Sequence, residues 1–320
     1  MKLRLNDEKI WIAGHTGMVG QAISRQLMHC DVVTCDRAEL DLRVESDVAN
    51  WVEQNRPSVV FLAAAKVGGI KANAENPVEF LLDNLKIQTN VIEAAAKFGV
   101  KKLIFIGSAC SYPKSARQPI VEADFLNGAP EKTNIWYATA KIAGVKLAQA
   151  FAAEGRLDSV VAMATNAYGP FDNFDEETSH VIPGLMSRFS RARLNRVDEM
   201  PIWGSGNALR EFIYVDDLAE ALIFLAEQYE SSDLINVGSG SEVSVKTLAH
   251  LIAEVTGYSG RIVTDSSKPD GAPRKILDSK LINKLGWVSS TNLMDGLRST
   301  YKWAHSNKLI GVTSKARDLI

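Results

Sequence analysis

Two side chains one helical turn apart, Tyr137 and Lys141 in the segment WYATAK, have the chemistry needed to reduce a carbonyl group. Their i, i+4 spacing places both on one face of a helix, with the lysine ammonium beside the phenol. A tyrosine ordinarily loses its proton near pH ~10, and a neighbouring cation favours the phenolate and lowers that pKa. We therefore expect Tyr137 to donate a proton to a carbonyl oxygen whose carbon receives hydride.

A second pair of reactive side chains lies at the end of the apolar segment KLIFIGS, residues 102–108, and just after it. Ser108 is expected at the carboxyl end of a strand, the edge where ligands bind in open α/β sheets, and its hydroxyl can hydrogen-bond the same carbonyl oxygen. Cys110 comes two residues later in the loop. From the residues alone, packing and a second chemistry are both open for this thiol.

Three glycines indicate the source of the hydride. Gly14, Gly17 and Gly20 lie between the strand-like segment KIWIA and an amphipathic helical segment. They allow a tight turn, a close backbone approach to a pyrophosphate and close packing of helix on strand, with the helix N-terminus facing the phosphates. Asp36, after the next strand, is typical of NAD binding, whereas Arg37 favours the 2′-phosphate of NADP. The pattern predicts a dinucleotide site and leaves the choice of cofactor open.

A parallel sheet must position these side chains, and the sequence supplies alternating strand and helix patterns. We expect apolar strands at residues 9–14, 31–36, 59–65, 102–108 and 159–166, and helices at 44–54, 77–98 and 137–154. Strands that are apolar throughout are typical of a sheet with helices on both faces. We predict an α/β fold with a Rossmann-type doubly wound parallel sheet in residues 1–170. A smaller α/β substrate-binding domain occupies mainly residues 171–320, with about 212–240 returning to the first domain.

Composition and charge narrow the functional class. The 320 residues carry a net charge of -2, which gives no electrostatic reason to expect nucleic acid as a partner. No apolar run approaches the ~18 residues of a spanning helix, and the first ten residues lack the apolar core of a signal peptide. The three cysteines, Cys30, Cys35 and Cys110, form no metal-ligand or disulfide pattern. We expect a cytoplasmic protein without a metal or a membrane partner.

The predicted helix at 77–98 is apolar on more than one face. One face must cover the sheet, and a second is suited to packing against another subunit, although deep burial would give the same pattern. We predict a homodimer through the helices at 77–98 and 137–154.

At this level of detail, GHTGMVG, GSACSYP and YATAK together resemble an extended short-chain dehydrogenase/reductase. Further segments along nearly the whole chain are similar to the GDP-L-fucose synthase family, namely AAAKVGGI, NAYGPFDNF, SHVIP, WGSG, NVGSG and KPDGAPRK. That family comprises GDP-4-keto-6-deoxy-D-mannose 3,5-epimerase/4-reductases. The resemblance implies that Ser108, Tyr137 and Lys141 serve the reduction, and that Cys110 and His180 exchange protons at C3 and C5.

The resemblance also implies the binding residues. A GDP-sugar would be held by Arg188, Trp203, Arg210 and Lys275. The cofactor would be NADP(H), with NAD(H) not excluded. Its expected contacts are Gly14, Thr16, Gly17, Met18, Val19, Gly20, Arg37, Asp41, Leu42, Ala63, Ala64, Tyr137, Lys141, Asn166 and His180.

Some positions depart from the family pattern. Thr16 stands where a basic residue is common, Ala109 and Ser111 flank the cysteine, and Ala167 replaces a larger residue. The change at Thr16 removes one expected phosphate contact and bears on the preference for NADP. Those at Ala109, Ser111 and Ala167 keep open a GDP-L-colitose synthase or a related 4-keto GDP-sugar epimerase/reductase. A plain nucleotide-sugar reductase or 4-epimerase, in which Cys110 and His180 only pack, and a non-enzymatic dinucleotide sensor are the alternatives outside that chemistry.

Overall fold

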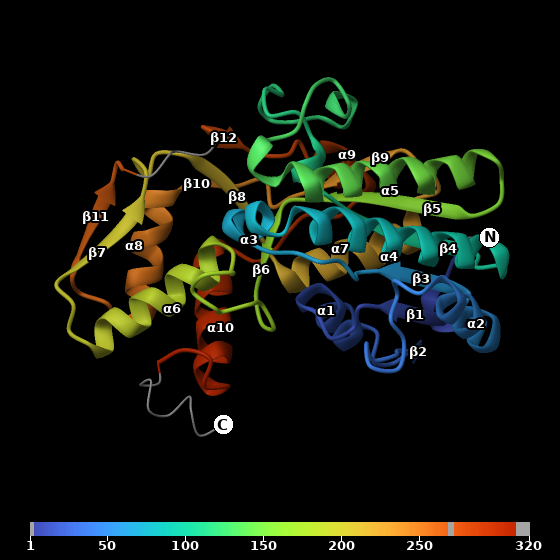
Figure 1. Ribbon diagram of the computed structural model, residues 1–320, viewed down its shortest axis with the longest axis horizontal. Helices are drawn as coiled ribbons and strands as arrows, with labels where there is room; N and C mark the ends of the chain where they lie inside the picture. The colour runs from blue at the N-terminus through green and yellow to red at the C-terminus, as the bar shows by residue number, and fades with distance from the viewer. Residues whose placement is uncertain (1–2, 268–271, 312–320) are drawn as a thin grey trace.

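The chain folds into two lobes, seen in a computed structural model that describes residues 3–267 and 272–311 (Figure 1). The larger lobe is built on a parallel sheet with the strand order β2-β1-β3-β4-β5-β9. Its strands are β1 (Lys9–Ala13), β2 (Asp31–Val33), β3 (Val59–Leu62), β4 (Lys102–Ser108), β5 (Asp158–Ala164) and β9 (Leu234–Val237). The chain reverses its direction of travel across the sheet between β1 and β3, which creates a crevice at their carboxyl ends.

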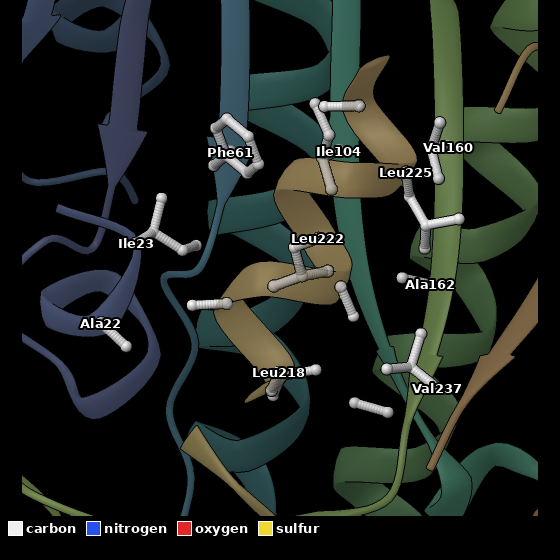
Figure 2. Packing of buried hydrophobic residues seen from close by; sticks show 14 of the residues in the cluster. Ala22, Ile23, Phe61, Ile104, Val160, Ala162, Leu218, Leu222, Leu225 and Val237 are labelled. Atoms are coloured by element: carbon white, nitrogen blue, oxygen red, sulfur yellow. The ribbon is translucent and has the colours of Figure 1, made fainter. Parts of the chain in front are cut away.

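Helices cover both faces of this sheet, as predicted, because the strands are apolar on both sides. One face carries α1 (Met18–Gln26) and α7 (Val215–Gln228), and the other carries α2 (Glu45–Asn55), α4 (Pro77–Lys97) and α5 (Ile135–Ala153). Figure 2 shows Leu218, Leu222 and Leu225 of α7 lying over the sheet, with Leu225 near Ile104 and Val160. The α/β fold class is thereby confirmed.

The smaller lobe has its own sheet and core (Figure 1). β8 pairs with β10, β12 and β6, and β7 pairs with β11. The strands are β6 (Asn166–Tyr168), β7 (Glu199–Trp203), β8 (Leu209–Tyr214), β10 (Glu242–Ser244), β11 (Arg261–Asp265) and β12 (Arg274–Lys275). The helices are α6 (Val181–Leu194), α8 (Val245–Thr256) and α10 (Leu293–Ser306).

Short elements complete the chain: α3 (Ile70–Glu75), α9 (Lys280–Leu285) and the 3₁₀ turns η1 (Leu5–Asp7), η2 (Ala109–Ser111), η3 (Glu122–Asp124) and η4 (Lys132–Asn134). None of the helices in the described ranges is long and apolar enough to cross a membrane.

One predicted strand boundary was wrong. The strand expected at 159–166 is two strands: β5 ends at Ala164 in the large sheet, and β6 begins at Asn166 and pairs with β8. Both Thr165 and Asn166 donate side-chain hydrogen bonds to the carbonyl oxygen of Glu211, which turns the chain into the second lobe. In the segment 212–240, α7 and β9 join the large lobe, whereas β8 belongs to the smaller one.

Candidate active site

The end of β4 and the first turn of α5 bring three of the predicted catalytic side chains together. Ser108 is the last residue of β4, and its Oγ accepts a hydrogen bond of 3.2 Å from the backbone N–H of Cys110. The hydroxyl groups of Ser108 and Tyr137 are hydrogen-bonded, and the charge of Cys110 acts on the Tyr137 phenol. Serine, cysteine and tyrosine therefore form one cluster at the carboxyl edge of the sheet.

The pKa of Tyr137 is shifted in the opposite direction to the prediction. We expected the ammonium of Lys141 to lower it, but burial raises it above its ordinary value, and the interaction with Cys110 acts in the same direction. Burial dominates because the phenolate, the charged form, loses its hydration in this site. Tyr137 is consequently a neutral phenol at neutral pH, which is the protonation state that a proton donor needs.

Lys141 lies one turn further along α5 and is only 5% exposed. Its Nζ donates a hydrogen bond of 2.8 Å to the carbonyl oxygen of Ile106, and lies 5.0 Å from the ring centroid of Phe105 and 5.9 Å from that of Tyr137. Burial lowers the pKa of this amine to about 8. The i, i+4 spacing thus places the amine next to the phenol, as expected.

Arg210, predicted as a substrate-binding residue, lies within electrostatic reach of the cysteine. Burial lowers the pKa of Arg210, while the charges of Cys110 and Glu131 act in the opposite direction. Lys275 on β12 pairs opposite Arg210 on β8. The register of β8 and β12 therefore places two cations side by side, near the loop at 109–111 that carries Cys110. The remainder of the KPDGAPRK motif, residues 268–271, lies outside the described residues.

The other two predicted substrate residues lie together in a separate groove of the smaller lobe. Arg188 and Trp203 line it with Arg191 and the acidic segment 175–177. One Arg188 Nη donates to the carbonyl oxygen of Pro201 at 2.5 Å, and the indole of Trp203 is 60% exposed. The four substrate candidates thus form two pairs, one beside Cys110 and one beside the acidic segment.

His180 occupies the N-cap position of α6, after the loop that leaves β6. Its imidazole has an exposed surface, yet surrounding protein atoms desolvate it and lower its pKa. Such a combination is typical of a side chain on a concave wall. The loop before it is tied to α3 through a hydrogen bond of 3.1 Å from Gly69 N to Thr178 O. His180 and Cys110, which both lie within the described range 3–267, make no hydrogen bond to each other.

The glycine loop fits a dinucleotide pyrophosphate. Gly14 has φ +92°, and a Cβ there would lie 2.6 Å from the backbone N of Ala64. A Cβ at Gly20 would lie 2.1 Å from the carbonyl oxygen of Gly14. α1 starts at Met18 after Gly17, which offers no side-chain cap, so its first N–H groups can face an anion.

Basic side chains lie against the acidic residues around the second strand. His15 Nε2 lies 3.2 Å from a carboxylate oxygen of the exposed Asp36. Arg43 binds Asp41 at 2.6 Å and holds the pKa of that carboxyl down to about 2. Sequence reasoning missed His15 and Arg43, although Arg43 is only two residues from Asp41. Arg37 is exposed, which leaves it accessible to a ligand phosphate.

The remaining cofactor candidates lie along the carboxyl edge of the large sheet. Several of them make their contacts with backbone atoms. Thr16 is exposed in the glycine loop, and Met18 and Val19 pack against the core below α1. Leu42 O accepts from Asn90 Nδ2 at 2.9 Å, Ala63 N donates to Ala13 O at 2.9 Å, and Ala64 faces Gly14. Asn166 Nδ2 is used in binding the Glu211 carbonyl. Among the described residues, no group of three or more His, Cys, Asp and Glu side chains is arranged to hold a metal ion.

The chain is similar to known proteins along nearly its whole length. Residues 10–238 match the model of the NAD dependent epimerase/dehydratase family. The chain is 49% identical to GDP-L-fucose synthase 1 of Arabidopsis thaliana, over 93% of this chain and 94% of that one. It is 35% identical to a GDP-L-colitose synthase of Yersinia pseudotuberculosis, over 94% and 99% of the two chains. A crystal structure of a GDP-L-fucose synthetase from Naegleria fowleri bound to NADP superposes with a TM-score of 0.87, at 29% identity, over 98% of this chain and 97% of that one.

Proposed function

Because the chain belongs to the NAD dependent epimerase/dehydratase family, and within it to the GDP-L-fucose synthases, we propose that it acts on GDP-4-keto-6-deoxy-D-mannose. It inverts C3 and C5 of this sugar and reduces C4. The chain is an NADP-dependent oxidoreductase of the GDP-L-fucose synthase type. The observation that carries the proposed chemistry is the cluster of Ser108, Cys110 and Tyr137. One hydrogen-bonding site for a ketone oxygen lies beside one thiol.

The reduction follows from the protonation states of α5. NADPH, when bound, supplies the hydride that C4 receives. Tyr137, kept protonated by its raised pKa, donates its proton to the C4 oxygen, and the Ser108 hydroxyl orients that oxygen. Lys141, whose pKa of about 8 lies near neutral pH, stabilises the phenolate that remains.

The epimerisation uses the same oxygen site. Protons at C3 and C5 are acidic because the charge left by their removal moves onto the C4 oxygen. The hydrogen bonds from Tyr137 and Ser108 then stabilise the enolate where its charge develops. Cys110 is suited to remove a proton on one side of the sugar, and His180, with its lowered pKa, to return one on the other.

The substrate's GDP portion suits the cationic pairs. Arg210 and Lys275, opposite each other on β8 and β12, are suited to a pyrophosphate next to the reactive loop. Arg188 and the exposed ring of Trp203 offer a cation and an aromatic surface to the rest of the nucleotide. The higher identity to a fucose synthase than to a colitose synthase supports a substrate that still carries its 3-hydroxyl group.

Deuterium uptake tests the role of the thiol. Wild-type protein incubated with the 4-keto substrate in deuterated water should incorporate deuterium at C3 and C5. Cys110→Ser should lower this uptake by about 10²–10⁴-fold, while C4 reduction of the uninverted sugar persists. Cys35→Ser is the matched control, since Cys35 lies beside β2 and outside the cluster. Unchanged uptake in Cys110→Ser would contradict the proposed role.

A homodimer through α4 and α5 is part of the proposal. Three apolar side chains at the first turns of these helices are exposed: Val78 (64%), Leu82 (44%) and Trp136 (42%). Both helices precede strands of the parallel sheet, so these ends lie at the same edge. A molecular mass equal to one chain in solution would contradict this proposal. The free thiols of Cys30, Cys35 and Cys110 fit the reducing cytoplasm that we propose as its compartment.

A further inference from the structure

The loop that carries Cys110 is held at its far end by a buried phenol. Tyr112, two residues after the cysteine, is only 1% exposed. Its hydroxyl donates a hydrogen bond of 2.6 Å to Oδ1 of Asn236, and its ring packs edge-on to Phe125 with centroids 6.1 Å apart. Burial and the charge of Glu122 raise the pKa of Tyr112, so the hydroxyl stays protonated at neutral pH and can donate this bond.

The acceptor of this bond is itself rigid. Asn236 lies in β9, is fully buried and pairs opposite Met163 of β5. Its Nδ2 donates to the carbonyl oxygens of Ile120 at 3.0 Å and Asp278 at 3.2 Å, and its backbone N–H donates to Glu122 at 2.9 Å. The two bonds from Nδ2 therefore set the direction in which Oδ1 points, and the strand pairing with β5 and the bond to Glu122 hold the backbone of Asn236.

The two ends of the reactive loop are held by different parts of the molecule. Ser108 is held by the sheet, because β4 pairs with β5 through to Ser108 opposite Ala164. Beyond Ser108 the chain leaves the sheet through the short turn at 109–111, in which Ala109 and Ser111 are also buried. The Ser111 hydroxyl has no hydrogen-bond partner among the described residues, whereas the Tyr112 hydroxyl is hydrogen-bonded to Asn236. Cys110 lies between these two anchors, whereas Tyr137 is held independently by α5.

We propose that Tyr112 and Asn236 are positioning residues for the Cys110 thiol, an inference that rests on the proposed function. Loss of the Tyr112 hydroxyl would free the loop at its far end and displace the thiol, while the sheet keeps Ser108 in place. The epimerisation should suffer more than the reduction, because a displacement of about 1 Å can lower a rate by about 10²-fold. A purely structural role would lower both reactions together.

The test is the ratio of two rates in Tyr112→Phe. Deuterium uptake at C3 and C5 of GDP-4-keto-6-deoxy-D-mannose should fall about 10-fold to 100-fold relative to NADPH oxidation, and the share of uninverted product should rise. Tyr229→Phe is the matched control. It removes the hydroxyl of another largely buried tyrosine, which lies just after α7. The backbone carbonyl oxygen of Tyr229, which accepts a hydrogen bond from Lys102 at the start of β4, is unchanged. The control should keep the wild-type ratio.

The outcomes separate this inference from the proposed function. A wild-type enzyme without deuterium uptake would overturn the epimerase function itself. If the wild type takes up deuterium and Tyr112→Phe keeps the same ratio of uptake to reduction, only the positioning role is overturned. Should Tyr112→Phe fail to fold, Asn236→Ser, which removes the same acceptor and leaves the phenol, must show the same fall in the ratio; an unchanged ratio would refute the role.

Discussion

Replacing Lys141 by methionine should stabilise the protein at neutral pH. The side chain is 5% exposed, and burial lowers the pKa of its amine from 10.5 to about 8. Below pH 8 the folded protein must therefore hold an ammonium group in a site that disfavours its charge. As the pH rises from 8 towards 10.5, the folded protein binds fewer protons than the unfolded chain, so the free energy of unfolding rises.

The size of the effect follows from the two pKa values. At 1.36 kcal/mol per unit, the depressed pKa corresponds to a penalty of about 3 kcal/mol at pH 7 and about 1 kcal/mol at pH 10. Methionine removes this penalty but also the hydrogen bond from Nζ to Ile106 O, a loss of about 1 kcal/mol. Lys141→Met should thus be more stable than wild type by about 2 kcal/mol at pH 7 and nearly equal to it at pH 10.

Urea unfolding of both proteins without ligands, at pH 7 and pH 10, measures this difference. Groups that titrate in both proteins cancel in the comparison. Lys146→Met is the matched control, because Lys146 is an exposed lysine on the same helix. It should show no pH-dependent difference from wild type. A Lys141→Met variant that is less stable at pH 7, or whose difference from wild type is the same at both pH values, would refute the reasoning.

Two further substitutions test the reducing half of the site. Tyr137→Phe should keep the fold and lower NADPH oxidation by about 10²–10⁴-fold, since it removes the proton donor; a rate near that of wild type would contradict the assignment. Gly20→Ala would place a Cβ 2.1 Å from the carbonyl oxygen of Gly14, so the turn must shift. We expect a lower melting temperature and weaker NADPH binding in a fluorescence titration, and unchanged affinity would show that the turn does not hold the cofactor.

The central strands were predictable because their signal is local, and their ends were not. The run Val59–Leu62 is apolar on both faces, and the residues alone predict a buried parallel strand. Its end depends on the close approach of Gly14 to Ala64, which lie fifty residues apart. The break between β5 and β6 likewise follows from the side-chain bonds of Thr165 and Asn166 to Glu211 O, 46 and 45 residues away.

The same distinction applies to the site. Tyr137 and Lys141 were predicted to be neighbours because four residues make one helical turn. The approach of Arg210 to Cys110 depends on how the lobes pack, and no spacing in the sequence reports it. The raised pKa of Tyr137 was missed for a related reason. The lysine is visible in the sequence, whereas the burial that raises the pKa of the phenol exists only in the folded protein.

The proposed stereochemistry depends on the junction between the lobes. Both reactions develop negative charge on one oxygen, so Tyr137 and Ser108 can serve both, but inversion needs groups on opposite sides of the sugar. Cys110 comes from the large lobe and His180 from α6 of the smaller one. The fully buried Glu211 ties the junction, because its carboxylate accepts from the backbone N–H groups of Gly240 at 2.8 Å and Leu277 at 3.0 Å. These bonds would help to keep the two proton-transfer groups on opposite sides of the sugar through both inversions.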